Sequence, residues 1–282
     1  MPASMPGGRE ELGQNFLVSS RVIGTIVDLV ARTAGPVVEL GAGDGAVTLP
    51  LSRGGRSVTA VEIDPRRVRR LRRTVPEHVA IVQQDMLRYR PPRHPHVLVA
   101  NLPFHLTTSV LRRVLAQEHW TDAVLLVQWE VARRRAGVGG ASLMTASWWP
   151  WYEFAVVTRV PAEAFRPVPS VDGGLLTVTR RKTPLVVDRV GYQRFVRDVF
   201  TGRGRGVSEV VTRTGWVSRP SMRAWMGARG LRSTMLPKDL TAEHWASLWA
   251  LATEDALSVR HLRFEQHPDS HVNSPRKRGR SR

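Results

Sequence analysis

A glycine-rich turn follows the first predicted strand. The segment Glu39-Leu-Gly-Ala-Gly-Asp-Gly45 places Gly41, Gly43 and Gly45 at alternate positions. Such a turn at the carboxyl edge of a parallel sheet lets the backbone approach a ligand closely. Dinucleotide-binding turns have the pattern G-x-G-x-x-G, whereas G-x-G-x-G spacing better fits a loop that holds a nucleoside joined to methionine. A tight turn without a ligand would have the same pattern, so the segment alone leaves both interpretations open.

Two carboxylates follow the next two predicted strands. Glu62 ends the second strand, where its side chain can accept hydrogen bonds from both hydroxyls of a ribose. Asp85 follows the third strand and can accept a hydrogen bond from an adenine amino group. Each carboxylate alone could be a solvated loop residue. Three such features in order, at the ends of three strands, together predict a binding site for S-adenosylmethionine.

The segment Asn101-Leu102-Pro103-Phe104 directly follows the fourth predicted strand. The amino nitrogen of adenine is a poor nucleophile because its lone pair is delocalised into the ring, so an enzyme must accept its hydrogens. The side-chain oxygen of Asn101 and the carbonyl of Leu102 or Pro103 can be those acceptors, because proline fixes the turn. Phe104 can stack on a base turned out of its helix. A strand-ending turn with a core phenylalanine is the alternative. After a methyl-donor loop, the segment favours methylation of adenine N6.

Alternating strand and helix patterns must position these residues. Asp64-Pro65 begins an arginine-rich helix, with aspartate as the cap and proline in the first turn. Alternating strand–helix units of this length predict a doubly wound parallel sheet in an α/β, Rossmann-like domain. Two later runs, 153–160 and 174–180, could pair as an antiparallel edge of the same sheet. The parallel strands are predicted at 36–41, 57–63, 78–82, 96–100 and 123–128, with helices near 46–52 and at 107–116.

A linker at 181–184 precedes a region with only helical patterns, at 192–201, 207–214, 221–228 and 242–252. Trp225, Trp245 and Trp249 recur there at helical spacing, which predicts the core of a small all-helical domain. The last seven residues, RKRGRSR, hold five positive charges and almost no core formers. We therefore expect a catalytic S-adenosylmethionine-binding domain at 1–182, a helical RNA-binding domain at 183–264 and a disordered basic tail at 265–282.

The charge balance of the 282 residues is strongly positive, with 42 Lys+Arg against 24 Asp+Glu and a net charge of +18. Only three of the 42 are lysine. Codon bias can explain arginine in place of lysine, but it does not explain the excess of arginine over glutamate. The charge favours a polyanionic partner, most simply nucleic acid. Arg133, Arg134 and Arg135 are candidates for phosphate contacts, whereas the arginines of 66–73 favour a solvated helix face.

The sequence contains no cysteine. This excludes disulfides, thiolate zinc sites and methylation of pyrimidine C5 through a cysteine adduct. The nine histidines show no ligand spacing, so we expect no metal. The N-terminal residues have no apolar signal region and no run of 18 apolar residues is present, so we expect a cytoplasmic protein that does not span a membrane.

Several ordered motifs resemble the rRNA adenine N6-methyltransferase family, which includes the erythromycin-resistance (Erm) methyltransferases and the small-subunit dimethyladenosine transferases. Phe104 and the stretch 128–140 are similar to Erm proteins of antibiotic-producing actinomycetes. The resemblance covers residues 12–180. Its motifs are Leu12–Leu17, Glu39–Gly45, Glu62–Asp64, Gln84-Asp85, Asn101–Phe104 and Phe165–Asp172.

The resemblance implies roles for individual residues. Asn101 would touch both cofactor and target amine, and Phe165 would face Phe104 across the flipped adenine. The cofactor contacts implied are Asn15 and Leu17 at the methionine end, Gly41 and Gly43 along it, Glu62 at the ribose and Asp85 at the adenine.

The implied function is S-adenosylmethionine-dependent mono- or dimethylation of one adenine in the peptidyl-transferase loop of 23S rRNA, giving resistance to macrolides, lincosamides and streptogramin B. We expect a monomer acting on naked or partly assembled rRNA. The alternative is a small-subunit dimethyladenosine transferase acting on 16S rRNA. A DNA adenine methyltransferase fits less well, because no target-recognition domain is evident. A non-catalytic RNA-binding protein on the same scaffold is opposed by the intact cofactor and target motifs.

Overall fold

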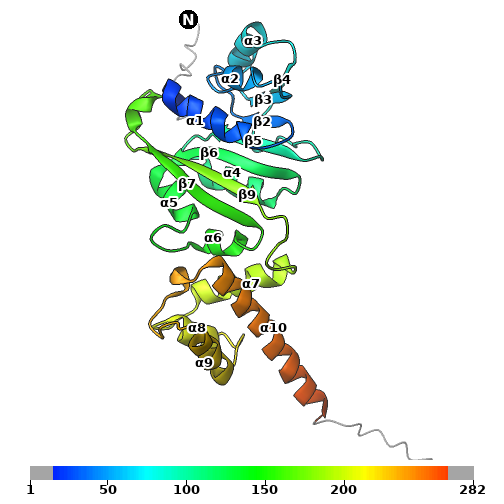
Figure 1. Ribbon diagram of the computed structural model, residues 1–282, viewed down its shortest axis with the longest axis vertical. Helices are drawn as coiled ribbons and strands as arrows, with labels where there is room; N and C mark the ends of the chain where they lie inside the picture. Colours follow the sequence, from blue (N-terminus) through cyan, green and yellow to red (C-terminus); the bar gives the residue numbers. More distant parts are fainter. Residues whose placement is uncertain (1–14, 266–282) are drawn as a thin grey trace, which may run out of the picture. The chain divides into compact units, whose positions relative to one another are not determined.

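Runs of valine, leucine and alanine form a seven-stranded sheet in the N-terminal part of the chain (Figure 1). The structure is a computed structural model that describes residues 15–265, with side chains described to residue 255. Five strands are parallel, as predicted. In sheet order they are β4 (Val79–Gln83), β3 (Val58–Glu62), β2 (Val37–Leu40), β5 (His96–Asn101) and β6 (Trp120–Gln128).

The edge beyond β6 is antiparallel. β9 (Gly173–Arg180) pairs with β6, and β7 (Tyr152–Val160) pairs with β9. This confirms the predicted pairing of the two late strands in the same sheet. A Pro-rich connection, residues 161–172, joins β7 to β9. Because β9 lies between β6 and β7, this connection is brought back to the carboxyl ends of the parallel strands. That edge of the sheet also carries the candidate site residues.

The arginine-rich helix begins at the predicted cap. The Asp64 side chain accepts from the backbone N–H of Arg66 at 2.7 Å and caps α3 (Pro65–Thr74). The helix predicted at 107–116 is α4 (Thr107–Ala116). Two short helices were not predicted: α5 (Trp129–Arg135) and α6 (Leu143–Trp148). The others are α1 (Ser20–Ala31) and α2 (Thr48–Ser52).

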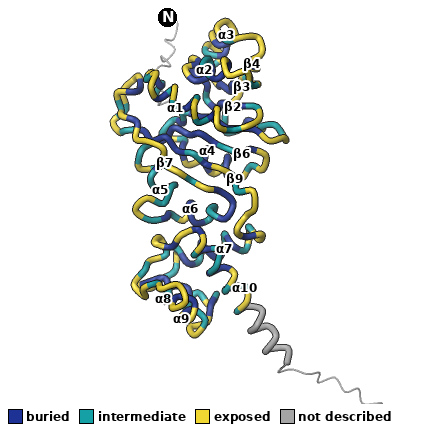
Figure 2. The backbone as a smooth tube through the Cα atoms, in the orientation of Figure 1, coloured by how far each residue is buried: buried dark blue, intermediate teal, exposed yellow. Residues whose placement is uncertain are grey.

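The central strands β2 and β5 are buried on both faces, as expected for strands covered by helices, whereas the edge strands β4 and β7 are partly exposed (Figure 2). Alternate residues of β5 and β6, such as Val97, Val99 and Val124, pack in one cluster with Ile26 of α1 and Leu71 of α3. Apolar side chains thus fix the strands, while the polar residues at their carboxyl ends remain outside the core. The α/β fold class is confirmed.

A second, two-stranded sheet joins the start of the described chain to the Pro-rich connection. β1 (Phe16–Leu17) pairs antiparallel with β8 (Phe165–Arg166), just after the 3₁₀ turn η1 (Ala162–Ala164). The backbone N–H of Val18 also donates to the Ala164 carbonyl at 2.8 Å. This pairing holds the N-terminal segment beside the site.

Contacts divide the chain into two units between Val187 and Asp188. The sequence predicted this boundary five residues earlier, after residue 182. The second unit is helical and packs around aromatic rings, with Phe195 lying 5.9 Å from Trp245 and 5.6 Å from Trp249 between ring centroids. Trp225, Trp245 and Trp249 are buried, as predicted. Its elements are α7 (Arg189–Thr201), α8 (Val207–Arg213), α9 (Arg219–Ala228), η2 (Pro237–Asp239) and α10 (Ala242–Glu265).

Helix α10 continues beyond the predicted end at 252 and reaches Glu265, the first residue of the predicted tail. Residues 266–282, with the rest of that tail, and residues 12–14 of the first motif lie outside the described residues. Among the described residues, no helix has the length and apolar character needed to cross a membrane. The same part of the chain contains no cluster of three or more His, Asp or Glu residues suited to a metal ion.

Candidate active site

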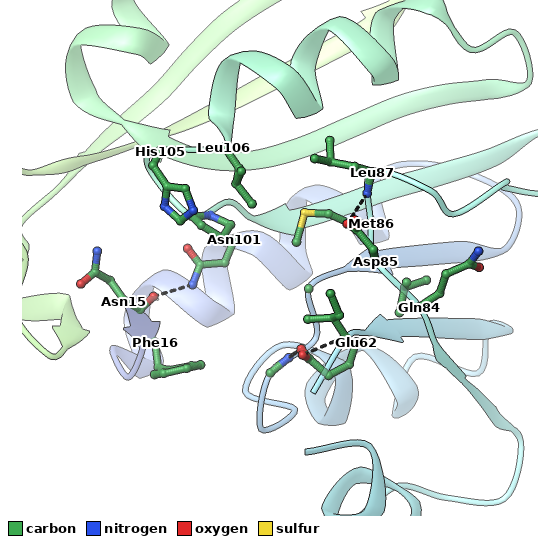
Figure 3. Close-up of a pocket in the computed structure, with 15 residues that line it drawn as sticks. Asn15, Phe16, Glu62, Gln84, Asp85, Met86, Leu87, Asn101, His105 and Leu106 are labelled. Atoms are coloured by element: carbon green, nitrogen blue, oxygen red, sulfur yellow. Dashed lines mark hydrogen bonds between the residues drawn. The ribbon is translucent and has the colours of Figure 1, made fainter. Parts of the chain in front are cut away.

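A cavity of about 300 Å³ lies at the carboxyl ends of β2, β3, β4 and β5 (Figure 3). It brings together most of the predicted cofactor residues with Pro103 of the target segment. It also contains residues that the sequence analysis did not select, among them Phe16, Met86 and His105. Its lining is Asn15, Phe16, Gly41, Gly43, Val61, Glu62, Ile63, Gln84, Asp85, Met86, Leu87, Asn101, Pro103, His105 and Leu106.

The glycine turn forms one wall of the cavity. Gly41 and Gly43 have φ angles of +75° and +56°, a region that residues with a side chain rarely adopt. A Cβ at Gly41 would lie 2.8 Å from the Met86 methyl carbon, and one at Gly43 would lie 3.4 Å from the Phe16 ring. The glycines therefore serve both the backbone conformation and the close approach of neighbouring side chains.

Glu62 fixes the glycine turn to the end of β3. One carboxylate oxygen accepts from the backbone N–H of Gly43 at 2.7 Å. The other accepts from the N–H groups of Ile63 and Asp64, each at 2.9 Å. The side chain is buried, and three backbone donors orient its carboxylate at the cavity wall. Oε2, which has a single backbone donor, retains acceptor capacity for a hydroxyl of a ligand.

Asp85 is oriented by the turn after β4. Its Oδ1 accepts from the backbone N–H of Leu87 at 2.8 Å (Figure 3). This bond leaves Oδ2 as the oxygen suited to a ligand amino group. Ile63, Met86 and Leu106 supply apolar surface to the same cavity, which suits the faces of a purine ring.

Asn101 ends β5, and its amide orientation is set by the N-terminal segment. Its Nδ2 donates to the Asn15 backbone carbonyl at 2.9 Å (Figure 3). A carbonyl can only accept, so the amide nitrogen must face Asn15 and the amide oxygen is left as an acceptor. The Pro103 carbonyl already accepts from the Leu106 N–H at 2.9 Å and the Thr107 hydroxyl at 3.3 Å. Of the two residues whose carbonyls the sequence left open, Pro103 lines the cavity and Leu102 does not, so the role of the Leu102 carbonyl stays a prediction.

Phe104 and Phe165 are neighbours, but their arrangement differs from the expected one. Their ring centroids are 6.3 Å apart and the rings are at 73°, edge to face. Phe165 is fully buried and belongs to the core cluster. A residue with no exposed ring face cannot form the second side of a base sandwich in this conformation. Phe104 is half-buried and keeps the stacking role open.

Strand alternation changes the contribution of β1. Leu17 was expected at the cofactor, but its side chain is 3% exposed and packs in the core. Phe16, on the opposite side of the strand, lines the cavity instead. Side chains alternate between the two sides of a strand, but β1 has only two residues, so the sequence does not show which of Phe16 and Leu17 faces the cavity.

Arg67 of α3 covers the outer side of Phe16. Its guanidinium carbon lies 4.0 Å from the centroid of the Phe16 ring, a cation–π distance. The same side chain forms an ion pair with Asp44 of the glycine turn, and its Nε lies 3.7 Å from Asp64. Arg67 thus links three segments that border the cavity. It is also engaged with acidic partners, unlike a purely solvated arginine.

The three arginines proposed for phosphate contacts differ in exposure. Arg134 is exposed, and Arg133 is half-buried and lies 3.4 Å from Glu130. Arg135 is only 8% exposed, and its Nη1 donates to the Ser142 hydroxyl at 2.6 Å. Burial also lowers the pKa of Arg135 below its usual value. Arg135 therefore joins α5 to the start of α6 and does not present its guanidinium to a phosphate.

Glu39 is a second buried carboxylate, at the end of β2 beneath the glycine turn. It is 4% exposed, and the Thr48 hydroxyl donates to its Oε2 at 2.5 Å. Burial is the main cause that raises the pKa of Glu39 from its ordinary value to about 8. The hydrogen bond from Thr48 opposes the shift, and the charge of Glu62 adds to it. Glu39 is consequently protonated in the folded protein at neutral pH.

Glu39→Gln should remove a pH dependence of folding. A carboxyl whose pKa rises from 4.5 to about 8 on folding stabilises the folded state below pH 4.5 and loses that contribution as pH rises to about 8. The free energy of unfolding of wild type relative to Glu39→Gln should fall by up to about 1.4 kcal/mol per pH unit across this window. Urea unfolding at pH 5, 7 and 8.5 measures it. The exposed Glu118→Gln is the control, and parallel curves for wild type and Glu39→Gln would contradict the prediction.

Known proteins resemble this chain in sequence and in structure. The ribosomal RNA adenine dimethylase family matches residues 6–254. Mycinamicin-resistance protein MyrB of Micromonospora griseorubida is 54% identical over 251 residues, 88% of this chain and 80% of that protein. An rRNA adenine N-6-methyltransferase of Corynebacterium diphtheriae is 49% identical over 211 residues, 74% of this chain and 83% of that enzyme. The crystal structure of 23S rRNA methyltransferase ErmE aligns with a TM-score of 0.78 and 30% identity, covering 85% of this chain and all of that one.

Proposed function

The chain belongs to the ribosomal RNA adenine dimethylase family, and from that membership we propose that it methylates N6 of one adenine in the peptidyl-transferase loop of 23S rRNA. S-adenosylmethionine is the methyl donor of this family. Relatives named for mycinamicin resistance and for 23S rRNA methylation favour the large-subunit RNA over 16S rRNA. The consequence for the cell is resistance to macrolides, lincosamides and streptogramin B.

The orientation of Asn101 carries the proposal. Its Nδ2 is held by the Asn15 carbonyl, so its oxygen is the group presented to an incoming amine. With the Leu102 carbonyl, it supplies two acceptors for the two hydrogens of an adenine amino group. Accepting both hydrogens returns electron density to N6 and draws it toward the geometry of a nucleophile. Because the amide is fixed before the reaction, this polarisation costs little reorganisation.

The residues present fit S-adenosylmethionine. The oriented carboxylate of Glu62 suits the two ribose hydroxyls, and Oδ2 of Asp85 suits the adenine amino group. Gly41 and Gly43 keep the wall free of side chains where the methionine part would lie. The donor, when bound, supplies a methyl on a sulfonium, whose carbon–sulfur bond breaks as the carbon–nitrogen bond to N6 forms.

Asn101 and Leu102 hold the amine during transfer, and the methylated ammonium loses its proton to solvent. No described side chain is needed as a general base. Phe104 is the ring on which the extruded adenine stacks. In the site that we propose, one purine face lies on Phe104, with Phe165 supporting that ring edge-on from the core.

We further propose a monomer that acts in the cytoplasm on protein-free or partly assembled rRNA. The target adenine must leave its stack to reach the cavity, and an unassembled RNA allows this more readily. Arg133 and Arg134 of α5 are the candidates for phosphate contacts in the catalytic unit. The helical unit is proposed to bind RNA as well.

Methyl transfer from labelled S-adenosylmethionine to protein-free 23S and 16S rRNA, mapped by mass spectrometry, tests the proposed function. We expect label on one adenine of the peptidyl-transferase loop, and the mass counts the methyl groups. Label confined to 16S rRNA would instead assign the protein to the small-subunit enzymes. Absence of label on both RNAs would reject rRNA methylation.

Arg67→Ala should weaken binding of the methyl donor with little effect on turnover. The substitution removes the cation–π contact with Phe16 and the ion pair with Asp44, each worth about 0.5–1 kcal/mol at a partly exposed site. We expect KM for S-adenosylmethionine to rise roughly three- to tenfold, with kcat within about twofold. Steady-state kinetics at saturating RNA measures the split.

Arg67→Lys should restore part of the loss, because an ammonium can still lie over the ring. Arg72→Ala, an exposed position on the same helix, is the matched control. An equal rise in KM for Arg72→Ala would show that only the net charge of α3 matters.

A further inference from the structure

The helical unit contains a hollow of about 620 Å³ lined by residues of α8 and α9. These two helices are in contact. Four arginines contribute to it, and they come from three separate segments of the unit. Its other lining residues are small or hydroxyl-bearing, apart from two apolar residues and one acid. The lining is Arg205, Gly206, Ser208, Glu209, Thr212, Arg213, Arg219, Arg223, Met226, Gly227, Leu231 and Ser233.

The hollow keeps a net positive charge after its arginines are counted against its carboxylate. Glu209 is its one carboxylate; its Oε1 pairs with Arg213 at 2.8 Å and its Oε2 accepts from the Arg205 backbone N–H at 2.9 Å. That backbone bond and the nearby arginines lower the pKa of Glu209 below its usual range, so it remains an anion. Four cations against one anion leave three positive charges around the opening. Arg219 and Arg223, one helical turn apart on α9, have no carboxylate partner in the hollow.

The loop that leads into α8 is built for close packing. Its sequence is Gly202-Arg-Gly-Arg-Gly206. A Cβ at Gly204 would lie 3.0 Å from the Val210 backbone nitrogen, and one at Gly206 would lie 2.4 Å from the Ser233 carbonyl oxygen. Both neighbours are backbone atoms that cannot move aside, so only glycine fits. The loop is thereby fixed against α8, and Arg205 is placed at the hollow.

We propose that this hollow is a binding site for the phosphodiester backbone of the rRNA substrate, built from residues other than those of the proposed adenine site. Guanidinium groups from several directions match the two free oxygens of a phosphate, which Arg can bind in a bidentate manner. The hydroxyls of Ser208 and Ser233 add neutral donors for phosphate or ribose oxygens, whereas the Thr212 hydroxyl donates to the Ser208 carbonyl at 2.9 Å. Among the described residues, no aromatic side chain lines the hollow, so it favours backbone contact over base stacking. The identity of the ligand rests on the proposed function.

The test compares two double variants of the full chain that each remove two positive charges. Arg219→Gln with Arg223→Gln changes the hollow, whereas Arg194→Gln with Arg197→Gln changes exposed positions of α7 outside it. Binding of a protein-free 23S rRNA fragment with the peptidyl-transferase loop is measured over a salt series without methyl donor. We expect the α9 variant to bind about tenfold more weakly, with the slope of log K against log salt reduced by roughly 0.7–0.9 for each lost phosphate contact. The α7 variant should keep the wild-type slope.

Further measurements separate the possible failures. Arg219→Lys with Arg223→Lys should recover most of the affinity, and the Kd for S-adenosylmethionine should be unchanged in every variant. Equal losses in the α9 and α7 variants, or wild-type RNA binding by the α9 variant, would overturn the site. Methyl transfer by the wild type tests the proposed function separately: if it methylates 23S rRNA while the α9 variant binds like wild type, only the phosphate site is wrong.

Discussion

Asn101→Ala should reduce methyl transfer to 23S rRNA by about 100- to 1,000-fold, the usual effect of removing one preorganised polar group from a reacting centre. The amide oxygen of Asn101 is left as an acceptor because its Nδ2 is bonded to the Asn15 carbonyl. Alanine supplies neither group, so the adenine amine loses one of its two acceptors. RNA affinity should stay within about twofold, because that contact is one of many along the substrate. Single-turnover transfer at saturating donor and a filter-binding Kd for RNA measure the two effects.

Asn15→Ala is the matched control for this prediction. Asn15 contributes its backbone carbonyl to the bond with Asn101, so alanine preserves the anchor. We expect this variant to keep its transfer rate at saturating donor and to raise KM for S-adenosylmethionine. Wild-type transfer by Asn101→Ala would show that the role assigned to this residue is wrong. A parallel loss of RNA binding would point to a structural role instead.

Most of the fold follows from patterns that are local in the sequence. The five parallel strands and α4 each contain enough residues for a period to be recognised. Helices α5 and α6 have seven and six residues, about two turns, and show no clear 3.6-residue period. The five-residue α2 was expected from its place after a strand and a glycine turn, a context that α5 and α6 lack. The pairing of Phe16 with Arg166 was also beyond prediction, because two-residue strands far apart in the chain carry no local signal.

The candidate site was predictable where one rule applies: parallel strands end at the same edge of a sheet. That rule selected Gly41, Glu62, Asp85 and Asn101, which the structure brings to one cavity. It gives no direction for side chains outside the strands. Burial of Arg135 against Ser142 depends on how α5 meets α6, and neither helix was predicted. The resemblance to a family likewise gave Phe165 a role but not its ring orientation.

The sequence does not distinguish the role of Arg67 from the roles of the neighbouring arginines. Six arginines occur between residues 66 and 73, and composition alone makes them equivalent. The structure distinguishes Arg67 because it faces Asp44 and Phe16, whereas Arg69 and Arg72 are exposed. Within this charged helix, Arg67 contacts Phe16 of the candidate cavity, and Arg70 lies 3.5 Å from Asp44 of the glycine turn. Charge runs are therefore better assigned residue by residue than as a block.

Glu62→Gln should weaken binding of S-adenosylmethionine by about 100-fold, although the two side chains have nearly the same shape. Both carboxylate oxygens accept backbone N–H groups: Oε2 from Gly43, and Oε1 from Ile63 and Asp64. A glutamine must place its NH₂ against one of these sets, which leaves buried donors unpaired at a cost of about 1–3 kcal/mol. One acceptor for the ribose is lost in the same step. Calorimetric titration with S-adenosylmethionine measures the change in Kd.

Asp85→Asn is the comparison that isolates this mechanism. An amide oxygen at position 85 can still accept from the Leu87 N–H, so this variant should lose only its contact with the adenine amino group, about tenfold in affinity. Both variants should keep wild-type affinity for RNA, and added donor should recover part of their transfer rate. Equal losses in Glu62→Gln and Asp85→Asn would contradict the special position of Glu62. The larger loss is expected there because the Glu62 carboxylate joins the glycine turn to the end of β3 and, in the proposed site, also holds the ribose.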